Sequence, residues 1–100
     1  MFNLNRKPTH PGEILKEEFL EPLEISQTQL AEDLGTSFKT VNDLINQKRN
    51  LSSELALKLA RYFNTSVELW LNLKNQNDIY RILKDKGKEI SKVRPFRISA

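Results

Sequence analysis

The chain has 100 residues, of which 38% are hydrophobic and 29% are charged, and its formal net charge is +3. This composition is typical of one small folded domain with a modest core and excludes a disordered segment. The absence of cysteine excludes disulfides and thiolate metal sites, and no apolar run approaches the ~20 residues that a membrane-crossing helix needs. Because the first residues hold no apolar stretch of signal-peptide length, we expect a cytoplasmic protein with no membrane partner.

The first nine residues are short and polar and are interpreted as an N-terminal arm. Phe2 and Leu4 alternate with asparagines, which is a weak pattern for an edge strand. A frayed tail is the alternative, because chain ends are commonly loose.

The first predicted helix opens at His10-Pro11-Gly12-Glu13. Proline suits the first helical turn, where its missing N–H is no loss, and glutamate complements the positive helix end. Pro22 is expected to stop this helix. His10 is the only histidine and lacks the neighbouring ligands that a metal or catalytic site requires, so we interpret it as a packing or terminal residue.

Residues 25–51 predict two short helices joined by a tight turn. Ser26 is a good N-cap for the first, which ends at Gly35, where glycine adopts the left-handed conformation at little cost. Thr36 or Ser37 can cap the second. The pair forms a helix-turn-helix, whose second helix is expected to enter the major groove of DNA. Amphipathic helices joined by glycine also occur in all-α proteins that bind no DNA.

The outward face of the second helix favours DNA binding. It carries no aliphatic residue, so it is not a packing face, and its polar side chains can read base edges or hold phosphates. Lys48 and Arg49 follow the helix, where contacts with the DNA backbone are usual. The polar residues of this face are Ser37, Lys39, Thr40, Asn42 and Asn46.

Two further helices are expected to close the core. The fourth begins at Ser52 and ends at Asn64, which tolerates the left-handed conformation. The longest helix covers residues 65–86, and its cap is Thr65 or Ser66. Its first half is strongly apolar, so its tryptophan is expected to fill the core.

A basic tail follows Gly87, where we expect the long helix to end. A heptad-like stripe along the long helix reaches Tyr80 and Leu83. Because the core is already closed at that point, this part of the stripe needs a partner. Residues 90–98 contain β-branched side chains and predict a terminal strand, which Pro95 confines to an edge. This segment would form a two-fold dimer, pairing with the arm; a disordered basic tail is the alternative. The expected dimer contacts are Tyr80, Leu83, Val93 and Phe96.

Charge is unevenly distributed along the chain. Residues 12–36 have a net charge of −6, whereas residues 74–97 have a net charge of +5. We therefore expect the acidic first helix to face away from DNA, and phosphates to be neutralised by the recognition helix, the loop after it and the basic C-terminal part. Because each chain supplies few such groups, tight binding needs two copies on one site.

Three stretches resemble the HigA-type antitoxins, which are also called virulence-associated protein I. They are HPGEIL at residues 10–15, LARYFNTS at residues 59–66 and ELWLNL at residues 68–73. The resemblance extends over residues 8–83, and the helix-turn-helix segment alone would indicate only a phage-repressor-like protein. It implies an all-α, five-helix, phage-repressor-like domain, which we place at residues 10–86. The basic tail at residues 87–100 is less clearly part of the family pattern, and the predicted terminal strands rest on the residue pattern alone.

The function that the resemblance implies is that of a bacterial type II antitoxin. Such proteins are homodimers that bind an mRNA-cleaving HigB-like toxin and repress their own operon through a palindromic operator in double-stranded DNA. The alternative is a stand-alone helix-turn-helix repressor without a toxin partner. An enzyme is not expected, because the sequence has no glycine-rich phosphate loop and no spaced carboxylate pair, and no cofactor or metal is implied.

The resemblance also implies roles for individual residues. The expected base contacts are Ser37, Phe38, Lys39, Thr40, Asn42 and Asp43, and the expected phosphate contacts are Gln27, Asn46, Lys48 and Arg49. Two positions depart from the family pattern. Gln47 stands where the family has a turn glycine, so a left-handed residue there would be strained by ~1 kcal/mol. Phe38 stands where the family often has a polar residue or proline; it either packs on a thymine methyl group or is buried against Gln27 and Leu30.

Overall fold

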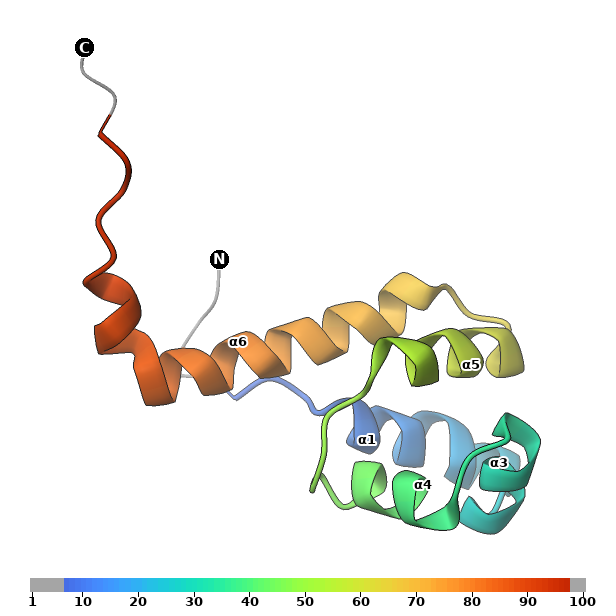
Figure 1. Cartoon of the computed structure of the whole chain (residues 1–100). Coiled ribbons are helices and arrows are strands. Elements are labelled where there is room, and N and C mark those ends of the chain that lie inside the picture. Colours follow the sequence, from blue (N-terminus) through green and yellow to red (C-terminus); the bar gives the residue numbers. More distant parts are fainter. Residues whose placement is uncertain (1–6, 98–100) are drawn as a thin grey trace.

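The computed structural model describes residues 7–97, and every regular element within them is helical. The elements are α1 (Pro11–Ile14), the π-helical turn η1 (Leu15–Leu20), α2 (Glu21–Leu23), α3 (Gln27–Leu34), α4 (Phe38–Ile45), α5 (Ser53–Phe63) and α6 (Val67–Ser91). Because α1, η1 and α2 form one helical stretch, the described chain has five helices, and the predicted all-α helix-turn-helix fold is confirmed. Figure 1 shows that α6 packs against the other helices with its first half and then extends away from them.

Pro22 does not end the first helix, contrary to the prediction. The helix continues past it and ends at Glu24, whose φ is 55°. In a regular α-helix the proline ring would press on the carbonyl four residues earlier. The wider π-turn relieves this contact, because the N–H of Glu21 bonds to the carbonyl of Lys16, five residues back.

Four serines cap the remaining helices. In each, the side-chain oxygen accepts a hydrogen bond of 3.0 to 3.2 Å from the backbone N–H three residues on, and such a cap is typically worth ~1 kcal/mol. The four are Ser26, Ser37, Ser52 and Ser66. Ser37 is therefore the cap of α4 and Thr36 is not. Ser66 caps α6, while Thr65 accepts a hydrogen bond of 2.9 Å from Nε1 of Trp70.

Trp70 lies at the centre of the core and is 0% exposed. The ring of Phe19 lies between it and Phe63, with centroid distances of 5.3 Å to Trp70 and 4.5 Å to Phe63. These rings join α6 to η1 and α5. Each other helix adds buried leucines, and burial of one such side chain stabilises the fold by ~1.5–3 kcal/mol. They include Leu15, Leu30, Leu44 and Leu59.

Gly12 brings α1 into close contact with α4. A Cβ atom at this position would lie 1.9 Å from the carbonyl oxygen of Leu44. No larger residue fits without moving one of the two helices. The position of α4 therefore depends on this glycine as well as on the apolar core.

The end of the long helix agrees in part with the prediction. Lys86, with a φ of −127° and a ψ of 18°, kinks α6 next to Gly87, where the helix was expected to end, and a second helical stretch then continues to Ser91. Residues 92–97 form no strand, so the predicted terminal strand is wrong for the described residues, and the predicted strand at residues 2–4 lies outside them. A strand needs a neighbouring strand for its backbone hydrogen bonds, and the described part of the chain offers none.

Candidate nucleic-acid interface

α3 and α4 form the predicted helix-turn-helix. Gly35 has a left-handed φ of 69°, and its N–H bonds to the carbonyls of the last turn of α3. Thr36 adds a bond of 2.9 Å from its N–H to the carbonyl of Ala31. This short turn places the apolar face of α4 against the core and leaves the opposite face at the outer surface of the molecule (Figure 1).

The predicted base-contacting residues differ in exposure. Ser37, Phe38 and Lys39 are exposed, whereas Thr40, Asn42 and Asp43 are half-buried. Phe38 is 50% exposed, which agrees with the exposed alternative and not with burial against α3. The first turn of α4 is therefore its most accessible part, and it presents a hydroxyl, an aromatic ring and an ammonium group together.

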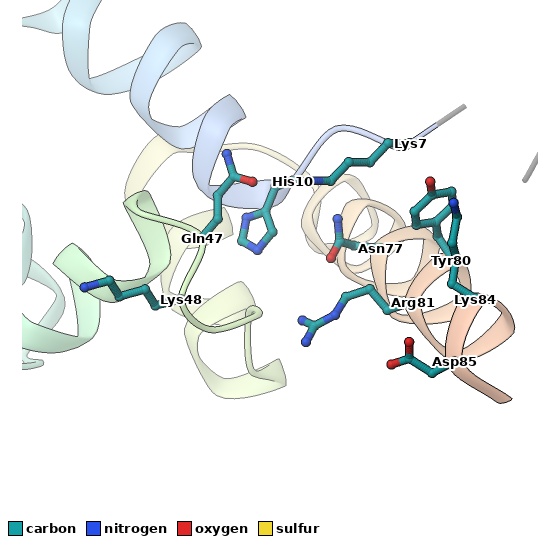
Figure 2. Close-up of a pocket in the computed structure, with 9 residues that line it drawn as sticks. All are labelled: Lys7, His10, Gln47, Lys48, Asn77, Tyr80, Arg81, Lys84 and Asp85. Carbon is teal, nitrogen blue, oxygen red and sulfur yellow. The ribbon is translucent and has the colours of Figure 1, made fainter. Parts of the chain in front are cut away.

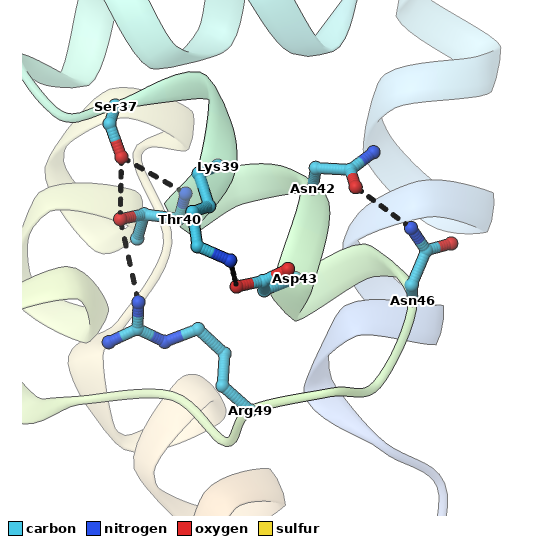
Figure 3. A network of polar contacts seen from close by, with 7 residues as sticks. All are labelled: Ser37, Lys39, Thr40, Asn42, Asp43, Asn46 and Arg49. Atoms are coloured by element: carbon cyan, nitrogen blue, oxygen red, sulfur yellow. Dashed lines mark hydrogen bonds and ion pairs between the residues drawn. The ribbon is translucent and has the colours of Figure 1, made fainter.

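Arg49 reaches back from the loop after α4 to the first turn of that helix. Its guanidinium donates to Oγ1 of Thr40 at 3.4 Å, and Oγ of Ser37 lies 2.9 Å from the same Oγ1 (Figure 3). The structure thus joins two predicted base contacts to a predicted phosphate contact. A positive charge is held beside the exposed start of α4.

A second chain of hydrogen bonds joins α3 to α4. Nδ2 of Asn42 donates to Oε1 of Gln27 at 2.9 Å, and Nδ2 of Asn46 donates to Oδ1 of Asn42 at 3.0 Å. Figure 3 shows Asn42 and Asn46 pointing toward one another. The amide of Asn42 is therefore largely occupied inside the protein, with one N–H left over.

Lys39 and Asp43 form an ion pair one helical turn apart. Nζ of Lys39 lies 2.9 Å from Oδ2 of Asp43, and the two side chains are 83% and 21% exposed. Exposed pairs of this kind are worth at most ~1 kcal/mol. The pair can therefore open at little cost if the lysine contacts a base or a phosphate.

Gln47 has a left-handed φ of 60°, as expected at a position where the HigA-type antitoxins have a turn glycine. Its N–H bonds to the carbonyl of Leu44 at 3.1 Å, and the N–H of Lys48 bonds to that of Asp43 at 2.8 Å. These bonds end α4 and turn the chain outward, so that Lys48 and Arg49 are both exposed.

The predicted dimer residues lie on the part of α6 that leaves the core and on the segment after it. Tyr80 and Leu83 are half-buried, while Val93 is 72% and Phe96 is 91% exposed. Ile82, which the sequence reasoning passed over, and Ile90, which opens the predicted dimer segment, are also exposed on the same half of α6. Among residues 7–97, no helix has both the length and the apolar composition needed to cross a bilayer.

His10 is a buried polar residue whose environment could not be read from the sequence. It is 5% exposed and caps α1, with Nδ1 accepting a hydrogen bond of 2.9 Å from the N–H of Gly12. Burial lowers the pKa of His10, and the positive charges of Arg81 and Lys7 lower it further. The only sequence signal was a histidine directly before Pro-Gly at a helix start.

Comparison with known proteins agrees with this geometry. The helix-turn-helix family pattern matches residues 16–70, which include both α3 and α4. The antitoxin HigA-1 of Vibrio cholerae is 36% identical over 99 residues, covering 99% of this chain and 93% of the relative. The chain belongs to the helix-turn-helix family that includes the HigA antitoxins.

Two other members of this family are similar to the chain. The uncharacterized HTH-type transcriptional regulator YbaQ of Escherichia coli K12 is 44% identical over 82 residues, covering 82% of this chain and 73% of YbaQ. The structure of the Pseudomonas aeruginosa antitoxin HigA with the higBA promoter has a TM-score of 0.82 and 40% identity, covering 90% of this chain and 99% of that one. Similarity to HigA antitoxins therefore extends beyond the helix-turn-helix into α6.

Proposed function

We propose that a homodimer of this chain binds a palindromic operator and represses its own operon, with α4 of each copy in the major groove. The observation that carries this proposal is the outward row of α4 from Ser37 to Asn46, held to α3 at one end and to Arg49 at the other. The similarity to the P. aeruginosa HigA, whose structure contains promoter DNA, supports it. A repressor of this kind acts on the bacterial chromosome and hence in the cytoplasm.

In this proposal the residues of the interface have different tasks. Ser37, Phe38 and Lys39 contact bases, because they form the exposed first turn of α4. Lys48 and Arg49 neutralise phosphates. Gln27 accepts a hydrogen bond from Asn42, and this bond fixes the angle between α3 and α4. Its side-chain N–H groups are offered to a phosphate of the DNA backbone.

Dimerisation supplies what one chain lacks. A single copy carries three basic side chains around α4, Lys39, Lys48 and Arg49, which is few for tight binding. The exposed apolar residues of the second half of α6 and of the following segment support a contact between two copies there, because apolar surface of this kind is stabilised by burial.

The same protein is proposed to neutralise an mRNA-cleaving, HigB-like toxin. The similarity to V. cholerae HigA-1 over nearly the whole chain supports this role. The second candidate is a repressor without a toxin, which the similarity to the transcriptional regulator YbaQ favours.

Two experiments test these proposals. Footprinting on the DNA upstream of its own gene should show two protected half-sites about one helical turn, ~34 Å, apart. Binding no tighter than to random DNA of the same length would contradict the repressor. Co-expression with each neighbouring open reading frame should yield one stable complex with a small basic protein whose toxicity is relieved; no such complex would favour the stand-alone repressor.

A further inference from the structure

A cavity of about 390 Å³ opens between the segment before α1, the loop after α4 and α6. We name it the His10 pocket; Figure 2 shows its lining. Its volume lies at the lower end of the ~300–1,000 Å³ that small-molecule sites occupy. Four basic side chains and one acidic side chain line it: Lys7, Lys48, Arg81, Lys84 and Asp85.

The imidazole of His10 forms a buried part of this lining. Because Nδ1 accepts a hydrogen bond from Gly12, the neutral ring carries its proton on Nε2. Nε2 is buried and has no hydrogen-bond partner among residues 7–97. The carbonyl of Arg49 lies near the ring and raises its pKa, but it does not meet hydrogen-bond geometry. Buried donors in folded proteins are rarely left without an acceptor.

Two of the cations extend toward the His10 side chain. Figure 2 shows Lys7 and Arg81 extending toward His10, whereas Lys48 extends away from it along the loop. Arg81 and Lys7 are the two charges that depress the pKa of His10, which places both within electrostatic reach of the ring. Neither forms an ion pair with another described residue. Asn77, which is 2% exposed, adds a buried amide to the same wall.

We propose that the His10 pocket binds a phosphate group. The guanidinium of Arg81 and the ammonium of Lys7 hold its oxygens beside the buried ring of His10, which senses the added negative charge without touching it. Arginine suits this task because its planar fork matches two phosphate oxygens at once. The phosphate belongs either to the DNA backbone, since Lys48 is shared with the DNA-binding loop, or to a free phosphorylated molecule.

The first experiment uses the full chain without DNA and does not depend on the proposed function. The single histidine is followed by nitrogen-15 NMR while inorganic phosphate is added at constant ionic strength and pH. The Nε2 resonance should shift and saturate. Arg81→Gln and Lys7→Gln should each weaken the apparent affinity about tenfold. Lys88→Gln, which removes the same charge from α6 outside the pocket, should leave the titration unchanged.

The second experiment identifies the source of the phosphate. If the DNA backbone supplies it, Arg81→Gln should lower the salt slope of DNA binding by about one relative to Lys88→Gln. If a free molecule supplies it, the slope should be unchanged and phosphate should still shift His10 in the DNA complex. A non-saturating or variant-independent shift, together with an unchanged salt slope, would overturn the proposal. Failure of operator recognition alone would remove the proposed function and leave the first experiment valid.

Discussion

The side-chain amide of Asn42 on α4 donates a hydrogen bond of 2.9 Å to Oε1 of Gln27 on α3. These residues are 15 positions apart in the sequence, and their bond connects the two helices of the helix-turn-helix directly. Asn46 completes the chain by donating to Oδ1 of Asn42. The recognition helix is therefore held by polar contacts on its outer side as well as by leucines on its inner side.

Gln27→Ala should lower the free energy of unfolding by ~0.5–1.5 kcal/mol, because it leaves the half-buried amide of Asn42 without its partner. It should also weaken binding to operator and random DNA by similar factors. Urea unfolding and fluorescence anisotropy measure the two effects. Thr28→Ala, a change at an exposed position of the same helix, is the matched control. Equal stability of the two variants would show that the bond is not made in solution.

Lys39→Ala and Arg49→Ala should have different effects on DNA binding. Loss of Lys39 should reduce the preference for operator over random DNA by about tenfold, because this side chain lies on the exposed turn of α4. Loss of Arg49 should weaken all DNA and lower the salt slope by about one. Anisotropy titrations at several salt concentrations measure both, with Lys88→Ala as the control for charge. A uniform loss of affinity with Lys39→Ala would contradict the assignment of base contact to this residue.

Gly12→Ala should destabilise the fold by ~1–3 kcal/mol or more, because the added methyl group would overlap the carbonyl of Leu44. The shift of α4 should reduce operator affinity as well. Gly87→Ala is the control: a Cβ there meets no atom within 4 Å, and alanine should be neutral or stabilise α6 by up to ~1 kcal/mol. Thermal unfolding of both variants measures the difference, and similar melting temperatures would exclude the close contact.

The lowered pKa of His10 predicts a pH-dependent stability. Burial and the charges of Arg81 and Lys7 disfavour the protonated ring in the folded state. Below the ordinary histidine pKa of about 6.5 the unfolded chain takes up a proton before the folded chain does, so stability falls as the pH drops from there to the folded pKa. Above 6.5 this contribution is fully present.

His10→Asn should remove this pH dependence between pH 7.5 and the onset of carboxylate titration. Asparagine retains a good N-cap acceptor, so the start of α1 is preserved. Denaturant unfolding at several pH values measures the slope, and the histidine NMR titration of the wild type gives the folded pKa directly. A folded pKa above 6.5 would contradict the buried environment described above.

Phe96→Ser should weaken the proposed dimer, because its ring is 91% exposed in one chain and would be buried between two. The dissociation constant should rise about tenfold or more. Lys92→Ser, in the same segment, should have little effect. Sedimentation velocity at micromolar concentration distinguishes the two variants, and identical oligomeric states would remove this segment from the dimer contact.

Local features were predictable from the sequence because the interactions that produce them span only a few residues. The serine caps reach three residues ahead, Gly35 and Asn64 end helices through their own backbone conformations, and the apolar period assigns the inner and outer faces of α4. For the same reason, the exposed side of α4 around Lys39 could be predicted without knowing which helices pack against its other side.

The tertiary structure decided what depends on residues far apart in the chain. The pairing of Gln27 with Asn42, and the meeting of His10 with Arg81, follow from helix packing. Such contacts depend on the angle and distance between helices, which one-dimensional periodicity does not contain.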